Sequence, residues 1–316
     1  LHLDAVISGS PSAPLLTLAA DLDNGSFADI AQGVELRHMR LHAAADRLNL
    51  KKDSGNRLEF TFSADDNRKG TVNLSGWLEP SSLALDVQGR INHLSPLRRQ
   101  DASIMLSGTL AVTGTASAPS VRADITVDKG QVQLSRLPGG DIVTLPIEEP
   151  GDVKKEEVPA IPGRLNVRIH IPNQLFIRGY GLECEWKGDI RLRGPLTRPG
   201  VTGGMQAVRG TLDILGRRFK LSEGEITFDG GWPVSPVLNV VMAYSSSDVT
   251  ADITLSGTAS RPEILLSSEP ELPKDEILSR IMFGKEANSL SHVQALQLAA
   301  GAAELAGFGG GGVMDL

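Results

Sequence analysis

Aromatic residues are scarce in this chain, and cysteine is almost absent. Phe, Trp and Tyr account for 4% of the 316 residues, and the single cysteine, Cys184, has no partner for an internal disulfide. No apolar run reaches the length of about 18 residues that predicts a membrane-spanning helix. The net charge is −7, whereas nucleic-acid binding calls for a basic face. The sequence therefore argues against a disulfide scaffold, a helical membrane protein and a nucleic-acid partner.

The sequence also has no converging set of reactive side chains. His38 and His42 lie in a stretch that alternates like a strand, where they would share a face about 13 Å apart, too far for one metal. Cys184 is expected to be buried on the same side as Trp186, and its glutamate neighbours would raise its pKa. We therefore expect no enzymatic activity, no cofactor and no metal site.

Period-two alternation of apolar and polar residues is the dominant pattern before residue 270. Apolar residues make up 41% of the chain, and this spacing predicts strands that bury one side only. The sequence thus predicts an all-β protein with one apolar sheet face. The positions expected to line a groove on that face for lipid or another client are Ile125, Val127, Val167, Ile169, Trp186, Ile190, Leu192, Ile226, Phe228, Ile253 and Leu255.

A short phrase, Gly followed by four residues and Pro, appears four times. Its copies are Gly9–Pro14, Gly114–Pro119, Gly194–Pro199 and Gly257–Pro262. Glycine permits a backbone bend, and proline cannot continue a helix or donate to a strand ladder. The phrase therefore predicts the crossing between consecutive strands, and its unequal spacing argues against a solenoid of fixed repeat length.

Composition divides the chain into five segments. Residues 1–136 and 163–270 are β-rich, and residues 137–162 are rich in Pro and charge, as expected for a surface loop or linker. Residues 271–306 change to helical spacing, and residues 307–316 form a Gly-rich tail. Because the chain starts with leucine and has no signal peptide, we expect it to be an internal or processed part of a longer protein.

Two helices are expected in the fourth segment. Apolar residues recur at three- and four-residue spacing from Ile277, and Gly284 is expected to end that helix. A second helix is expected over residues 289–305, where Ser291 and Gln294 match a capping box. These helices would either cover the open end of the sheet or dock on a partner or membrane.

The stretch from Pro270 to Gly284 resembles the C-terminal region of the TamB family. It combines Pro-x-Leu-Pro-x-Asp-Glu-x-Leu-Ser with Phe-Gly and precedes a helix rich in Gln, Leu and Ala. Gly210–Phe219 and Gly224–Phe228 also resemble the family, so the resemblance covers roughly residues 186–306. The motif positions are Pro273, Asp275, Glu276, Leu278, Phe283 and Gly284.

This resemblance implies an AsmA-like bridge protein, in which an elongated curved β-sheet folds into a trough (β-taco-like) with an apolar interior and short C-terminal helices. It implies a periplasmic location, within an inner-membrane-anchored protein that reaches the outer membrane. The implied partners are an outer-membrane barrel of the Omp85 type (TamA-like), phospholipid acyl chains and unfolded outer-membrane proteins. The family continues with a further β-rich terminus, which this chain is expected to lack.

Three functional interpretations follow. The first is a groove for phospholipid transport between the two membranes, with support for outer-membrane protein assembly. The second is a chaperone-like scaffold that binds outer-membrane protein strands by β-augmentation at its edge strands. The third is a structural spacer. Because an apolar trough exposed to water is costly and acyl chains would fill it, the first interpretation is favoured.

Overall fold

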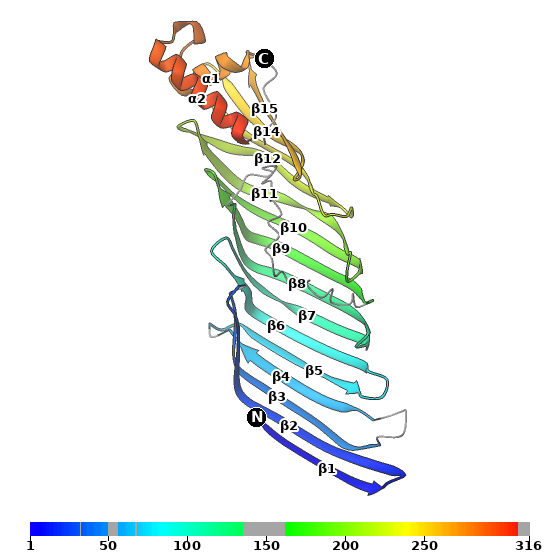
Figure 1. Cartoon of the computed structure of the whole chain (residues 1–316). Coiled ribbons are helices and arrows are strands. Elements are labelled where there is room, and N and C mark those ends of the chain that lie inside the picture. Colours follow the sequence, from blue (N-terminus) through cyan, green and yellow to red (C-terminus); the bar gives the residue numbers. More distant parts are fainter. Residues whose placement is uncertain (32, 50–55, 67, 135–161, 309–316) are drawn as a thin grey trace, which may run out of the picture. The chain divides into compact units, whose positions relative to one another are not determined.

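The computed structural model describes residues 1–31, 33–49, 56–66, 68–134 and 162–308. Most of the expected 137–162 loop and of the 307–316 tail lies outside these residues. The described part contains fifteen strands, then two α-helices separated by a 3₁₀ turn (Figure 1). Its strands are β1 (His2–Ser10), β2 (Ala13–Asp29), β3 (Val34–Asn49), β4 (Leu58–Asp65), β5 (Thr71–Glu79), β6 (Ala84–Arg98), β7 (Ala102–Thr115), β8 (Ala118–Gln133), β9 (Arg164–Gly179), β10 (Leu182–Pro195), β11 (Gly200–Ile214), β12 (Arg217–Asp229), β13 (Val237–Ser245), β14 (Thr250–Thr258) and β15 (Arg261–Glu269).

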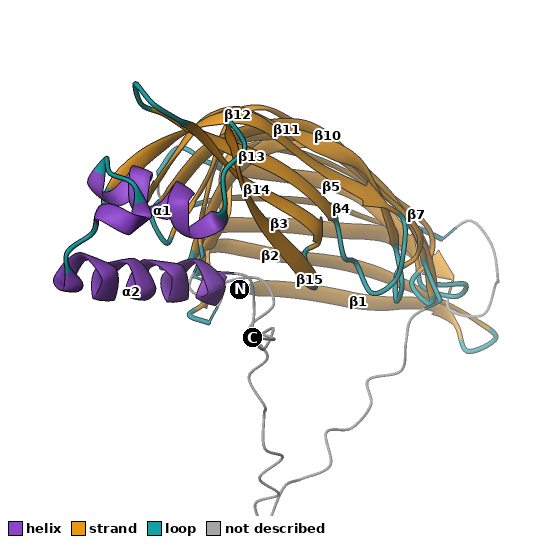
Figure 2. Cartoon of the chain, turned by 90° about the horizontal axis from the view of Figure 1, so that it is seen from above, coloured by secondary structure: helices purple, strands orange, loops and turns teal. Residues whose placement is uncertain are grey.

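Within the described residues, the strands follow one another in the sheet in their order along the chain. The order is linear, so the sheet is not closed, and β1 and β15 have one neighbouring strand each. The prediction of an all-β fold with short C-terminal helices is confirmed. The chain divides into two compact units: unit 1 contains residues 1–131, 160–175 and 188–202, and unit 2 contains residues 132–159, 176–187 and 203–316. Within each unit the strands arch along their length (Figure 2).

Strand register in unit 1 aligns the apolar side chains into continuous rows. Successive partners across β1 to β7 lie on the same side of the sheet because alternate residues point the same way. The first row is Leu3, Ala20, Ala43, Phe60, Gly76, Val87 and Val112. The second row is Leu22, Leu41, Phe62, Leu74, Gly89 and Leu110. We call the surface formed by these two rows the apolar face of unit 1.

The long strands of unit 1 bend where the β4–β5 hairpin ends. β4 and β5 have 8 and 9 residues, whereas β3 and β6 have 16 and 15. Both long strands show register shifts here, between Arg37 and Arg40 in β3 and between Ile91 and Leu94 in β6. Past the hairpin, β3 and β6 contact each other although they are not neighbours in the sheet. We call this bend the crease; extra residues of this kind bend a strand locally.

The inner side of the crease is a small apolar core. Side chains from β3 and β6 meet there with those of the hairpin, and the cluster consists of Ala64, Val72 and Leu94 with Leu36, Met39, Phe62, Leu74 and Ile91 packed against them. At the hairpin turn, the carboxylate of Asp66 accepts hydrogen bonds from the N–H groups of Gly70 (2.9 Å) and Ser95 (3.1 Å). This buried carboxylate therefore ties the turn to β6.

All four Gly–Pro phrases lie between consecutive strands, as predicted. The first residues of the four copies are Gly9, Gly114, Gly194 and Gly257, and their φ values lie between 82° and 122°. A residue with a Cβ rarely adopts such values. In two copies, a threonine hydroxyl accepts a hydrogen bond from the N–H three residues later. Ala118 N–H donates to Thr115 Oγ1 (3.1 Å), and Arg261 N–H donates to Thr258 Oγ1 (3.2 Å). The phrase is thus a recurrent β-hairpin turn.

The helices begin and end close to the predicted positions. α1 (Lys274–Phe283) ends at Gly284, whose φ of 65° is left-handed as expected for a C-cap glycine. The 3₁₀ turn η1 (Ala287–Ser289) delays the second helix, so α2 (His292–Phe308) begins later than predicted. The predicted capping box is present: Ser291 N–H donates to Gln294 Oε1 (3.0 Å), and Gln294 N–H donates to Ser291 Oγ (3.4 Å).

The hairpin phrase can be tested at Gly114, where φ is 106° and an added Cβ would lie 3.0 Å from the carbonyl oxygen of Ala118. We expect Gly114→Val to lower the free energy of unfolding by about 1–3 kcal/mol, because the backbone conformation disfavours a β-branched residue. Urea denaturation followed by circular dichroism measures the change. The matched control is Ala116→Val, an exposed position in the same turn; equal destabilisation by both changes would contradict this account.

Candidate functional site

The apolar face of unit 1 is only partly covered. Phe60, Phe62 and Leu74 lie in the middle of its rows and Leu110 lies at the end of the second row, and all four are half-buried. Residues of these types are usually among the most buried in a folded protein. Unit 1 therefore presents aligned apolar side chains that the described residues cover incompletely.

Six of the predicted groove positions belong to unit 1, and they share one pattern. Each alternates with more exposed polar residues on its strand, and five of the six are half-buried. The half-buried positions are Ile125, Val167, Ile169, Ile190 and Leu192, whereas Val127 is 2% exposed. The alternation is as predicted, and a role for these residues in binding stays a prediction.

The predicted positions in unit 2 are more deeply packed. Trp186, Ile226 and Ile253 are buried, and Phe228 and Leu255 are half-buried. Buried neighbours in the same unit include Phe219, Met242 and Ala251. Unit 2 therefore closes much of its apolar side on its own side chains, in contrast to unit 1.

A hollow of about 1040 Å³ crosses unit 1 along the row from Leu22 to Leu110. Its lining adds the polar neighbours on both sides of that row, among them Asp21, Arg40, Asn73, Gln88 and Arg122. The next apolar row, which includes Phe60 and Val87, does not line it. The residues directly before and after the row line the hollow, and their side chains point to the side opposite to the apolar row, because adjacent side chains point to opposite sides of a sheet. The hollow therefore lies on the polar side. The apolar face is thus an open surface distinct from this hollow.

Four histidines of unit 1 are exposed on the strands, and each is paired with an aspartate of another strand. In every pair the imidazole Nδ1 contacts a carboxylate oxygen, in His38–Asp65 (2.9 Å), His42–Asp21 (2.7 Å), His93–Asp128 (3.0 Å) and His170–Asp189 (2.8 Å). Among the described residues, no group of three or more His, Cys, Asp and Glu side chains is arranged to hold a metal ion.

Cys184 is fully buried, as predicted. Burial raises the pKa of its thiol to about 11, and the charge of Glu183 adds to this shift. The sequence predicts a contribution from both neighbouring glutamates, whereas the shift comes from burial and Glu183. Both glutamates are paired with arginines, Glu183 with Arg178 (2.9 Å) and Glu185 with Arg209 (2.6 Å). A thiol with so high a pKa is a poor nucleophile near neutral pH.

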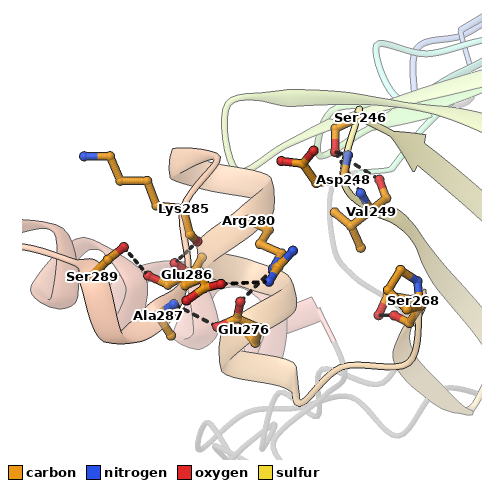
Figure 3. Close-up of polar contacts among 12 residues, drawn as sticks. Ser246, Asp248, Val249, Ser268, Glu276, Arg280, Lys285, Glu286, Ala287 and Ser289 are labelled. Carbon is orange, nitrogen blue, oxygen red and sulfur yellow. Dashed lines mark hydrogen bonds and ion pairs between the residues drawn. The ribbon is translucent and has the colours of Figure 1, made fainter.

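The Pro273–Gly284 motif builds a closed turn between α1 and η1 (Figure 3). The carboxylate of Glu276 accepts hydrogen bonds from Arg280 Nε (2.6 Å) and from the N–H of Ala287 (2.8 Å). Both bonds favour the ionised form, so they lower the pKa of Glu276, the Ala287 bond most. Leu278 is buried, and Asp275 and Glu276 occupy the first turn of α1. Among the motif residues, Glu276 therefore ties α1 to the start of η1.

No helix in the described ranges is both long enough and apolar enough to cross a bilayer. The model of the TamB family, described as the TamB C-terminal domain, matches residues 59–316. This chain belongs to the TamB family. The match extends well upstream of the stretch, roughly residues 186–306, in which the sequence resemblance was apparent.

A curated TamB relative matches most of the chain. The translocation and assembly module subunit TamB of Haemophilus influenzae is 21% identical over 295 residues, which is 87% of this chain and 23% of that protein. The chain thus spans about a quarter of the length of this relative.

Arg217 is a structural residue of this TamB segment that the sequence did not reveal. Its Nε donates to the carbonyl oxygen of Ile281 (2.7 Å), and its Nη2 donates to that of Met282 (3.3 Å). A cation at the C-terminal end of a helix donates hydrogen bonds to the free carbonyl groups and interacts favourably with the negative end of the helix dipole. The contact joins residues 64 positions apart, which no local pattern predicts.

Two apolar side chains of α2 face away from the α1–α2 contact. Val293 and Leu296 are 65% and 73% exposed. The opposite side packs instead, since Gly301 is buried and an added Cβ there would lie 2.9 Å from Met282 Sδ. Val293 and Leu296 therefore do not cover the open end of the sheet.

The α1–η1 turn of this TamB segment gives a prediction about pH. Because the pKa of Glu276 is lowered in the folded state, its contribution to stability is fully present above the ordinary carboxyl pKa and is lost as the pH falls through the lowered value. We expect the thermal stability of Glu276→Gln to fall less than that of the wild type between pH 6 and pH 3, measured by circular dichroism. Glu271→Gln, on the exposed linker before α1, is the control; equal pH responses in all three proteins would refute the role of Glu276.

Proposed function

We propose that this chain is part of a translocation and assembly module, in which the apolar face of unit 1 holds phospholipid acyl chains in transit between the inner and outer membranes. The observation that carries the proposal is that the two apolar rows are aligned across β1–β7 and that most of their residues are half-buried. A surface of this kind is stabilised by any apolar ligand that replaces water on it.

An acyl chain matches this surface in size and chemistry. Each buried methylene contributes about 0.8 kcal/mol, so a chain of ~16 carbons gains roughly 13 kcal/mol at full burial. The rows run across successive strands spaced about 4.8 Å apart, so similar side chains recur along the path. Apart from Phe60 and Phe62, the side chains of the rows are aliphatic, and such a lining favours sliding over tight local binding.

Family membership supports the wider role. The Haemophilus influenzae relative is named as a subunit of the translocation and assembly module. By that likeness we assign the chain to the periplasm, within a protein anchored in the inner membrane, and we assign it a TamA-like outer-membrane barrel as partner. Support for outer-membrane protein assembly belongs to the same proposal.

One feature favours β-augmentation as the second candidate function. β15 has a single neighbouring strand, and Leu265 on it is 53% exposed. An unpaired strand edge can accept an extended segment of an unfolded outer-membrane protein through backbone hydrogen bonds. This candidate uses the edge of the sheet, whereas lipid transport uses its apolar face.

Charged substitutions separate these functions. We expect Leu74→Asp and Ile190→Asp to reduce binding of fluorescent phosphatidylethanolamine by about tenfold or more, because a carboxylate beside an acyl chain has to be desolvated. Binding is measured with the purified chain after incubation with labelled liposomes.

The matched control is Ser75→Asp, an exposed position next to Leu74 that points to the opposite side of the sheet. It carries the same added charge and is expected to bind lipid like the wild type. Unchanged lipid binding in Leu74→Asp, with folding retained, would rule out the apolar face as the lipid site, and the same result in Ile190→Asp would rule out the predicted groove position on β10.

A further inference from the structure

Two histidines lie where the long strands of unit 1 bend. His38 in β3 and His93 in β6 have φ values of 46° and 48°, in the left-handed region. The register shifts that define the crease enclose both residues. Histidine adopts this conformation more readily than most residues, but it still costs free energy unless the surroundings hold it.

Each of these histidines is held by contacts to another strand. His38 Nδ1 contacts Asp65 Oδ2 at 2.9 Å, at the end of β4. His93 Nδ1 contacts Asp128 Oδ2 at 3.0 Å, and Ser107 on the strand between them donates to the same oxygen at 2.5 Å. The N–H of His93 donates to Ser107 Oγ at 2.9 Å. Contacts therefore link β6, β7 and β8 at the bend.

The two sides of the crease differ in chemistry. The imidazoles of His38 and His93 are 57% and 65% exposed, whereas the inner side is the apolar cluster around Ala64, Val72 and Leu94. Packing of the cluster draws the arms of the bend together. On the exposed side, the polar pairs lie at the two positions where the backbone of the bend is left-handed.

The same unit contains two His–Asp pairs of similar geometry away from the left-handed positions. His42–Asp21 and His170–Asp189 have contacts of 2.7 and 2.8 Å, and neither histidine has a positive φ. Asp21 and His42 are direct register partners. These pairs join strands but do not hold a bend, so they provide an internal comparison.

We propose that His38 and His93 are clamps that set the angle of the crease, and with it how far the apolar face is shielded from water. The structural part of this proposal concerns unit 1 alone. Only its consequence for lipid rests on the function proposed above. A wider crease would leave a bound acyl chain more exposed to water and weaken its retention.

The angle can be measured with spin labels at the two ends of β6. Ser81→Cys and Gln100→Cys lie in exposed turns on either side of the bend, and buried Cys184 is left in place. Double electron–electron resonance on the full chain then reports the distance across the crease. In the Asp65→Ala/Asp128→Ala variant we expect this distance to increase by at least about 3 Å, roughly one residue of strand rise.

Two further variants make the result decisive. The His38→Gly/His93→Gly variant permits positive φ but lacks the imidazoles, so we expect it to lengthen the distance as well. If the Asp65→Ala/Asp128→Ala variant fails to fold, this variant tests the clamp on its own. Asp21→Ala/Asp189→Ala removes the partners of His42 and His170 and should leave the distance unchanged. A wild-type distance in the His38→Gly/His93→Gly variant, or equal lengthening in the Asp21→Ala/Asp189→Ala control, overturns the proposal.

Lipid binding by the same proteins separates the clamp from the proposed function. If the crease widens and phosphatidylethanolamine retention falls, both proposals are supported. If the wild type binds no phosphatidylethanolamine while the distances change as expected, the clamp stands and the lipid function fails. If the wild type binds lipid and the distances do not change, the clamp fails and the lipid function stands.

Discussion

A β-sheet that turns all its apolar side chains to one side has to cover that side. Strand alternation imposes this constraint on the whole chain, because each strand has one apolar and one polar side. Burial of apolar area contributes about 25 cal/mol per Å², so an uncovered face is a standing cost and an attractive site for an apolar ligand. The crease and the helix α1 each bury part of the apolar side.

The two units meet it differently. Unit 2 packs Phe219, Met242 and Ala251 into a buried core, and α1 adds the buried Ile277 and Ile281. In unit 1 the crease encloses a small cluster, but the rows beyond it are half-buried. Unit 2 is therefore stabilised by its own side chains, whereas an apolar ligand would stabilise unit 1 further.

Much of the fold could be predicted because its determinants are local. Alternation, the Gly–Pro turns, the C-cap at Gly284 and the Ser291–Gln294 capping box each depend on residues a few positions apart. Alternation also indicates which positions are apolar, but the predicted groove positions lie on β8 to β14, outside the two rows of the apolar face, and their role in binding stays a prediction. The differing burial of these positions could not be predicted, since it depends on which strands fold over which face.

The features that escaped prediction are long-range. His38 and His93 look like ordinary strand residues in the sequence, and their left-handed conformations occur where β3 and β6 bend past a short hairpin, which no local pattern indicates. Arg217 reaches the end of a helix far along the chain. The polar hollow likewise forms from strands whose register a single sequence does not specify.

Photo-crosslinking from opposite sides of one strand tests the central claim most directly. A benzoylphenylalanine at Phe62, in the apolar face, is compared with one at Ser63 on the other side and one at Ser267 on β15, and the adducts are identified by mass spectrometry. The account predicts phospholipid adducts at Phe62 and none at Ser63. Protein adducts at Ser267 with no lipid at Phe62 would contradict it.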